Sequence, residues 1–147
     1  MFLLAGLGNK GKKYSDTRHN VGFNDIDKLV AHYEFKTEKK NLNSHTFRGI
    51  INDNKIILLK PMTFMNNSGK SVSEISSFYK IPLKRIFIIH DDVDLSVARV
   101  KVKCGGSDGG HNGIKSIDQY IAKDYYRIRI GIGKPANFIQ VKDYVLK

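Results

Sequence analysis

The sequence of 147 residues is poor in several features that would assign it to particular protein classes. Cys104 is the only cysteine, so no internal disulfide can form, and a reducing, cytoplasmic setting fits. No run approaches the roughly 20 apolar residues of a membrane span, and the apolar start at residues 1–5 is too short for a signal peptide. Repeats, low-complexity tracts and linkers are absent, which indicates one domain with its own core.

Acidic residues are scarce relative to basic ones. Lysine and arginine together number 25 against 14 for aspartate and glutamate, which gives a net charge of +11 with histidine neutral. Such a surplus favours a polyanionic partner such as nucleic acid, because basic side chains release counterions from phosphates. A lysine-rich surface that serves solubility explains the same surplus, and charge alone leaves both interpretations open.

Four short polar segments interrupt the apolar sequence, each after an expected strand. In an open α/β sheet, functional groups gather where the strands end. The segments offer imidazoles, carboxylates and side-chain amides, but no obvious nucleophile. This set suits a site that activates water and binds a polar, carbonyl-bearing substrate, which points to hydrolysis without a covalent intermediate. The segments are Gly8-Asn9 leading to Arg18-His19-Asn20, Phe64-Met65-Asn66-Asn67, His90-Asp91-Asp92, and Gly110-His111-Asn112-Gly113.

Hydrophobic periodicity predicts strands interleaved with helices. Strands are expected at residues 2–6, 45–52, 55–60, 86–89, 99–104 and 127–130. The second and third form a hairpin across Asp53-Asn54, and the run at 86–89 is typical of a central strand. Helices are expected around residues 26–33, 72–79 and 114–121, with Asn67 or Ser68 able to cap the second. The pattern predicts an α/β fold, a single-domain α/β/α sandwich with a central mixed β-sheet.

The strands at 99–104 and 127–130 both alternate basic and apolar side chains. Arg99, Lys101 and Lys103 share one face of the first, and Arg127 and Arg129 share one face of the second. Solvated sheet edges commonly carry such stripes, and a surface that binds phosphates would carry them as well. Both interpretations remain open.

Three other motifs fit their usual functions poorly. The stretch GLGNKG at residues 6–11 matches a dinucleotide-binding pattern, but a polar loop rather than a helix follows it, so we interpret its glycines as a turn that presents Asn9. Ser107 lies in a glycine-rich stretch that resembles the nucleophile elbow of an esterase, but the histidine and carboxylate of a triad do not follow in the required order. A metal site built from the histidines and aspartates is not favoured, because no pair has the spacing of a helical zinc motif.

His19 is the strongest candidate for a general base. An imidazole, with an unperturbed pKa of about 6.5, can accept a proton near neutral pH. A buried carboxylate on its other nitrogen would fix the tautomer and raise the basicity, and Asp91 at the end of the central strand is placed to do so. Asparagine side chains could hold the water and polarise a carbonyl group, although caps and loop hydrogen bonds are their commoner role.

The sequence resembles the bacterial-type peptidyl-tRNA hydrolase family over nearly its whole length. Several multi-residue matches occur in the right order, which is far more specific than any single motif. The matching segments are Gly6-Leu7-Gly8-Asn9, Tyr14 with Thr17-Arg18-His19-Asn20, residues 60–66 (KPMTFMN) with Ser68-Gly69, His90-Asp91-Asp92 with Asp94-Leu95, Gly109-Gly110-His111-Asn112-Gly113, and residues 129–133 (RIGIG).

The resemblance implies cleavage of the ester between a peptide and the 3′ end of tRNA, which recycles tRNA from aborted translation. By this likeness His19 activates water, Asp91 supports its basic form, and Asn9 helps to distinguish peptidyl from aminoacyl substrates. The groove for the peptide and the terminal nucleotide is expected to be lined by Tyr14, Phe64, Asn66 and Asn112. Lys103 and Arg129 match positions that bind tRNA phosphate. No metal or organic cofactor is implied.

The sequence departs from the family in two places. Lys10 stands where the family usually has proline, which removes a restriction on the turn but leaves Asn9 in place. The chain ends at Lys147, whereas family members usually continue into a lid segment and a C-terminal helix. Residues 1–147 are therefore expected to form a peptidyl-tRNA hydrolase-like domain that lacks this segment.

We expect a monomeric, cytoplasmic hydrolase that acts on peptidyl-tRNA without association with a membrane. The main alternative is a non-catalytic or degenerate module that binds tRNA or another RNA without turnover. A small-molecule esterase that uses Ser107 is a third class.

Overall fold

Seven strands form one mixed sheet in the computed structural model, which describes residues 1–134 and 141–146 apart from the side chain of Lys142. The strand order is β2-β3-β4-β1-β5-β7-β6. β1 pairs in parallel with β4 and β5, and β5 pairs in parallel with β7, whereas the outer pairings are antiparallel. The strands are β1 (Phe2–Gly6), β2 (Lys36–Lys40), β3 (Ser44–Ile51), β4 (Asn54–Pro61), β5 (Ile86–Asp92), β6 (Val100–Cys104) and β7 (Tyr126–Gly131). The expected α/β fold with a central mixed sheet is confirmed.

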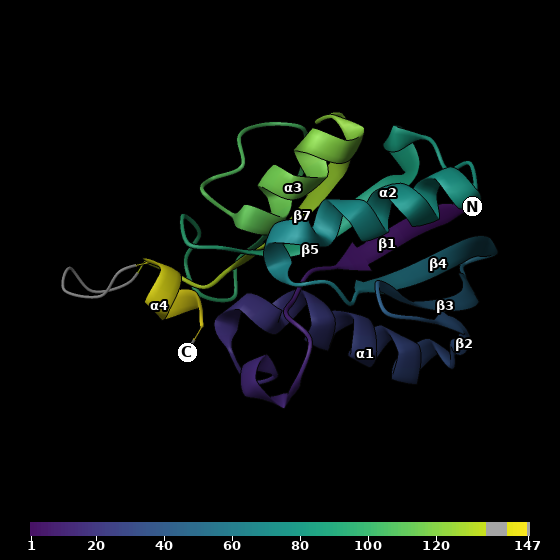
Figure 1. Ribbon diagram of the computed structural model, residues 1–147, viewed down its shortest axis with the longest axis horizontal. Helices are drawn as coiled ribbons and strands as arrows, with labels where there is room; N and C mark the ends of the chain where they lie inside the picture. The colour runs from purple at the N-terminus through teal and green to yellow at the C-terminus, as the bar shows by residue number, and fades with distance from the viewer. Residues whose placement is uncertain (135–140, 147) are drawn as a thin grey trace.

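Helices cover both faces of this sheet (Figure 1). α1 (Val21–Tyr33) packs on one face, α2 (Ser68–Phe78) and α3 (Asn112–Ile121) pack on the other, and the short α4 (Val141–Val145) lies beyond one end of the sheet. Among the described residues, no helix combines the length and the apolar character that crossing a bilayer demands.

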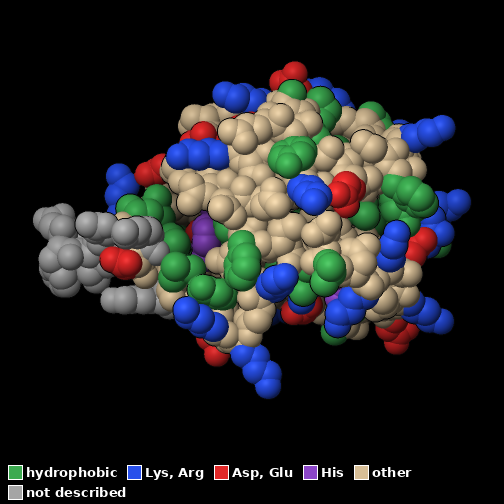
Figure 2. All heavy atoms as spheres, in the orientation of Figure 1, with side chains coloured by type: hydrophobic (Ala, Val, Ile, Leu, Met, Phe, Trp, Pro, Cys, Tyr) green, Lys and Arg blue, Asp and Glu red, His purple; other side chains and the backbone are tan. Residues whose placement is uncertain are grey.

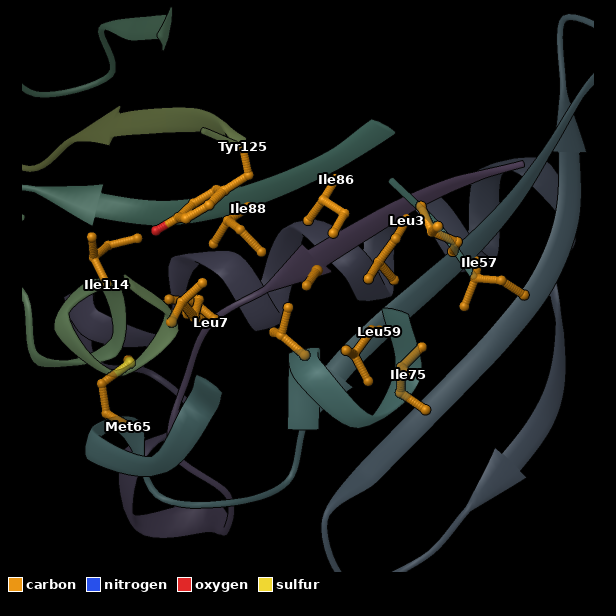
Figure 3. Packing of buried hydrophobic residues seen from close by; sticks show 14 residues of the cluster. Leu3, Leu7, Ile57, Leu59, Met65, Ile75, Ile86, Ile88, Ile114 and Tyr125 are labelled. Carbon is orange, nitrogen blue, oxygen red and sulfur yellow. The ribbon is translucent and has the colours of Figure 1, made fainter. Parts of the chain in front are cut away.

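The larger hydrophobic core lies between the sheet and the pair α2–α3. Figure 3 shows Leu3, Ile57, Ile86 and Ile88 of the sheet directed toward this layer, with Ile114 of α3 packed nearby. A smaller cluster, which includes Ile26, Phe47, Leu58 and Ile89, fills the space under α1. Strands β1 and β5 contribute to both clusters, which explains why their sequences are apolar on both faces.

Three strand assignments differ from the expected ones. β5 continues to Asp92 instead of ending at Ile89, so His90, Asp91 and Asp92 belong to the strand itself. The β3–β4 hairpin turns at Asn52 and Asp53, one residue earlier than predicted, and both have positive φ angles, 48° and 65°. Asn54 already belongs to β4, where it pairs with Ile51. The sequence analysis missed β2, because its residues KTEKK are all exposed and lack the alternation that marks a half-buried strand.

Asn67 is the N-cap residue of α2, one of the two positions predicted, but its side chain forms no capping hydrogen bond. Asn67 also ends a 3-10 turn, η3 (Met65–Asn67), that leads directly into the helix. The Ser68 hydroxyl donates instead to the carbonyl of Met65, at 2.8 Å. This turn matters for the site, because it holds the backbone of Met65 close to the first strand.

Glycines in β1 and at the start of α1 allow the helix to approach the sheet closely. A Cβ atom at Gly6 would collide with the carbonyl of Gly22, and one at Gly22 would collide with the backbone of Leu7. A Cβ atom at Gly8 would overlap the ring of Phe23. Gly6 and Gly8 of the predicted turn therefore serve close packing, which draws the 3-10 turn η2 (Arg18–Asn20) against the loop after β1.

Gly22→Ala is expected to lower the free energy of unfolding by about 1–3 kcal/mol, the usual cost of overpacking. Its methyl group meets backbone atoms, which cannot move aside as a side chain can. Urea denaturation measures the change. Lys28→Ala, an exposed change on the same helix, is the matched control and should stay within about 0.5 kcal/mol of the parent. Equal stability of the two variants would contradict the close-packing argument.

Candidate active site

A cavity of about 420 Å³ opens where the carboxyl ends of β1 and β5 meet the turn η3 and the loop that precedes α3. Parallel strands that lie side by side end at the same edge of a sheet, so the polar segments after them converge there. In Figure 2 a histidine side chain is visible in a recess at this end of the molecule, bordered by hydrophobic side chains. Predicted site residues that line the cavity are Asn9, His19, Phe64, Asn66, Asp91 and Asn112.

His19 and Asp91 meet at the floor of this cavity. Nδ1 of His19 lies 2.8 Å from Oδ1 and 2.8 Å from Oδ2 of Asp91, although the two residues are 72 positions apart. Both are buried, with 8% of His19 and 3% of Asp91 exposed. Because a carboxylate only accepts hydrogen bonds, Nδ1 of His19 carries the proton and Nε2 keeps its lone pair.

His111 is a second imidazole on the same carboxylate. Its Nε2 lies 2.8 Å from Oδ1 of Asp91. Its Nδ1 accepts from the backbone N–H groups of Gly113 and Ile114, at 3.1 and 3.3 Å, and so caps the start of α3. An Nδ1 atom that accepts cannot carry a proton, so this cap fixes the tautomer and leaves the proton on Nε2, from which it is donated to Asp91.

The sequence analysis assigned no role to His111 beyond the set of candidate metal ligands. Helix caps are usually recognised in a sequence by serine, threonine, aspartate or asparagine, so the histidine at this position did not indicate a cap.

Asp91 stays ionised in this environment. Burial alone would raise the pKa of its carboxyl group, but the interactions with His111 and then with His19 outweigh this effect and hold the pKa below its usual range. Asp91 is therefore a permanent anion near neutral pH. It can stabilise a positive charge that develops on a neighbouring imidazole.

Asn9 is held rigidly by two neighbours. Its backbone N–H donates to Oδ1 of Asn20 at 2.8 Å, and its carbonyl accepts from Nδ2 of Asn20 at 2.9 Å. Its own Oδ1 accepts from the backbone N–H of Met65 at 2.7 Å. The amide oxygen of Asn9 is thereby engaged, which leaves its Nδ2 group as a donor at the cavity. Sequence reasoning noted Asn20 beside His19 but gave it no role.

Only some of the remaining predicted residues line the cavity that contains His19 and Asp91. Phe64, Asn66 and Asn112 line the cavity, whereas Tyr14 lies in the 3-10 turn η1 (Lys12–Tyr14) and does not line it. Lys103 and Arg129 line a smaller neighbouring cavity. Tyr14 and the two basic residues are therefore apart from the histidine–aspartate centre, and their roles stay predictions.

The two basic stripes lie on one face of the sheet, where Arg127 is buried and bonded to Asp118. The register of β6 and β7 pairs Lys101 with Arg129 and Lys103 with Arg127. Nε of Arg129 is bound to Oδ2 of Asp92 at 2.7 Å, which neutralises part of its charge. Lys103 is exposed and carries its charge at the surface.

The mouth of the cavity is bordered by segments distant in the sequence. Val141, Val145 and Leu146 form one side. The guanidinium of Arg18 lies 4.1 Å from the ring centroid of Tyr144, whose hydroxyl donates to the carbonyl of Ile132 at 2.6 Å. The residue next to His19 thus contacts α4 directly.

The hydrogen bonds of the site bear on two alternative functions considered from the sequence, a metal site and a serine esterase. His19, Asp91 and His111 offer ligand atoms within 4.8 Å of one another, a spacing that a metal ion could use. The proton on Nε2 of His111 occupies the nitrogen that would face such an ion, which argues against this set as ligands. Ser107 lies in the loop before α3 and lines the smaller cavity, whereas His19 and His111 are both bonded to Asp91.

A mixed α/β sheet that ends in an imidazole–carboxylate pair and side-chain amides is typical of an enzyme of the hydrolase class. Comparisons with known proteins agree. The profile of the family described as Peptidyl-tRNA hydrolase matches residues 3–147. The chain belongs to the peptidyl-tRNA hydrolase family.

Individual relatives are similar over nearly all of this chain. It is 50% identical to a peptidyl-tRNA hydrolase of Wolbachia pipientis wMel and 53% identical to one of Rickettsia conorii, covering 99% of this chain and 80% of each relative. A crystal structure of peptidyl-tRNA hydrolase from Acinetobacter baumannii superposes with a TM-score of 0.94 at 39% identity, covering 100% of this chain and 76% of that one. An Arg119Gln mutant of that enzyme superposes with a TM-score of 0.95.

His90, beside Asp91, makes the stability of the fold depend on pH. Burial and then the nearby His111 lower the pKa of His90 from 6.5 to about 3. The unfolded chain therefore takes up a proton first, so the stabilisation is complete above pH 6.5 and is lost as the pH falls toward 3. We expect the free energy of unfolding to fall by up to about 1.4 kcal/mol per pH unit in this range.

Urea titrations between pH 6.5 and 5 measure this dependence. Asp91 does not contribute in that window, because a depressed carboxyl pKa affects stability only near and below the usual value of 3.8. His90→Asn should flatten the slope, whereas His32→Asn, at an exposed histidine of α1, should leave it unchanged. Identical slopes in the parent and His90→Asn would show that His90 is not the titrating group.

Proposed function

We propose that this protein hydrolyses peptidyl-tRNA, cleaving the ester between the peptide and the terminal ribose of the tRNA. The observation that carries the proposal is the pair His19–Asp91 at the floor of an open cavity, within the fold of the peptidyl-tRNA hydrolase family. In this pair, Nε2 of His19 is free to accept a proton from water while Nδ1 is bonded to Asp91.

In the proposed reaction, Nε2 of His19 removes a proton from a water molecule as its oxygen attacks the ester carbonyl. Nδ1 of His19 keeps its proton and continues to donate to Asp91, whose negative charge stabilises the imidazolium that forms. The imidazolium then returns the proton to the ribose oxygen that leaves. His111 holds the carboxylate from its other side, so that Asp91 stays aligned with His19.

Side-chain amides would bind the polar groups of the substrate. The Oδ1 atom of Asn9 is engaged by Met65, so its Nδ2 group can donate to a substrate carbonyl, a group that an N-blocked substrate has in addition to its ester. Asn66 and Asn112 lie at the same cavity and offer further donors and acceptors. The exposed ring of Phe64 offers a face for a base or a side chain to stack on.

The tRNA would lie across the basic face of β6 and β7. The net charge of +11 favours a polyanion, and Lys103 and Arg129 lie on the face that adjoins the cavity. Because Arg129 is already paired with Asp92, Lys103 is the better single test of this path. We further propose that the protein acts as a monomer in the cytoplasm, where translation produces its substrate.

His19→Ala should lower kcat for an N-blocked aminoacyl-tRNA by about 10²–10⁴-fold, the usual contribution of a positioned general base. The affinity for tRNA should change little, because His19 is buried and contributes no phosphate contact. Release of the blocked amino acid measures turnover, and filter binding measures affinity.

His32→Ala is the matched control, because His32 is an exposed histidine outside the cavity. Near-parental rates in His19→Ala would exclude the assigned base. A parent protein that binds the substrate without cleaving it would instead support the non-catalytic RNA-binding module. Resistance of the parent activity to serine-directed inhibitors, with activity kept in Ser107→Ala, would close the esterase alternative.

Lys103→Ala should weaken tRNA binding at low salt and flatten the plot of log affinity against log salt by about one unit, as for one lost phosphate contact. Lys28→Ala is the control, because it removes an equal charge from exposed α1, on the other face of the sheet. If both variants change the slope equally, general charge rather than a defined path accounts for binding.

A further inference from the structure

A second, smaller cavity of about 70 Å³ lies between the ends of β5, β6 and β7 and the loop before α3. Among the residues that line it are His90 and Arg127, which are buried, with 5% and 2% exposed. In the described part of the chain, Nε2 of His90 and Nε of Arg127 are buried side-chain nitrogens without a hydrogen-bond partner. Such atoms are rare in folded proteins, because a buried polar group without a partner destabilises the fold.

The sheet register directs both side chains to the same side. β5 and β7 are parallel, with Ile88 paired to Arg127 and His90 paired to Arg129. Paired residues share a face, and residues two positions apart on one strand share it as well. His90 and Arg127 therefore lie on the α3 face of adjacent strands, and both reach the same small cavity.

His90 presents an acceptor to this cavity. Its Nδ1 lies 2.8 Å from the backbone carbonyl of Asp91, which can only accept, so Nδ1 carries the proton. The imidazole is neutral at physiological pH, because its pKa is lowered to about 3. The lone pair of Nε2 is thus available and requires a donor.

Arg127 presents a donor. Its Nη1 donates to the carbonyl of Ser107, and its Nη2 is bound to the carboxylate of Asp118 at 3.0 and 3.3 Å. The N–H group at Nε is left and requires an acceptor. The charge of the guanidinium is already balanced by Asp118, so the cavity needs no further counter-ion on its account.

These opposite requirements identify the chemistry of the occupant. A fully deprotonated anion could accept from Arg127 but could not donate to His90, and the aspartates that line the cavity disfavour any anion. A metal ion would be repelled by the guanidinium. A group that both donates and accepts satisfies the two nitrogens together, and water is the smallest such group. A volume of about 70 Å³ exceeds the roughly 10–15 Å³ that one buried water molecule requires, so the cavity can hold water.

We propose that an ordered water molecule occupies this cavity, donates to Nε2 of His90 and accepts from Nε of Arg127. The water locks His90 in the tautomer that holds the backbone carbonyl of Asp91. A hydrogen-bonded chain then runs from Tyr125 through Asp118, Arg127, the water and His90 to the backbone of Asp91. His90 is thereby a positioning residue for the carboxylate that serves His19, a role that rests on the proposed hydrolysis.

Two measurements on the whole protein test the water itself, independently of any activity. Nitrogen-15 NMR of the imidazoles should show His90 neutral, protonated on Nδ1 and unchanged from pH 8 to 5, with Nε2 shifted as an acceptor of a hydrogen bond. A high-resolution crystal structure should show density within hydrogen-bond distance of both nitrogens. A proton on Nε2 of His90, or an empty cavity, would overturn the proposal.

A matched pair of variants tests the positioning role. The amide of asparagine reaches the place of Nδ1, so His90→Asn can still donate to the Asp91 carbonyl. The amide of glutamine reaches the place of Nε2, so His90→Gln keeps the contact with the water but loses the bond to Asp91. We expect His90→Gln to lose about tenfold more of kcat than His90→Asn, as for one hydrogen bond, with a smaller difference in KM.

Equal losses in the two variants, or a larger loss in His90→Asn, would overturn the positioning role. If a variant fails to fold, the NMR and crystallographic results on the parent protein still decide whether the water is present. A parent protein that lacks hydrolytic activity would contradict the proposed function. The NMR and crystallographic results would still decide independently whether the water site exists.

Discussion

The whole site depends on one buried carboxylate that receives hydrogen bonds from two imidazoles. Removing the charge of Asp91 from water is costly, and the N–H groups of His19 and His111 offset that cost. Each donor is in turn constrained, His19 by the turn packed against β1 and His111 by its bond to the start of α3. Loss of either constraint would leave a buried anion with too few partners, so the stability of this region and its chemistry share one cause.

The sheet topology supplies the geometry for this interaction. β5 lies between β1 and β7, so its carboxyl end has the loop of His19 on one side and the basic strands on the other. Close packing at Gly6 and Gly22 draws the helix that follows His19 onto the sheet. The same strand thus carries Asp91 to the larger cavity and His90 to the border between the two cavities, because His90 lines both.

Much of this architecture could be predicted from the sequence, because strong periodicity and polar segments after strands are local signals. The pairing of His19 with Asp91 followed from chemical type and from the expected strand ends. The turn at Asn52 and Asp53 could not be distinguished from Asp53-Asn54, because all three residues tolerate positive φ, and the register follows from packing Phe47 against Leu58. β2 carries no apolar pattern, and the bond of His111 to Asp91 is a contact across the fold that residue types do not encode.

The groups that meet at the carboxylate of Asp91 are far apart in the sequence, so they are synthesised at different times. While it is being translated, this protein is itself a chain esterified to tRNA, the kind of molecule we propose it cleaves. His19 and Asp91 can meet only after β5 has paired with β1, and the second donor, His111, is made later still. The nascent chain therefore has no complete catalytic centre until the segment that carries His111 has been synthesised and folded onto Asp91.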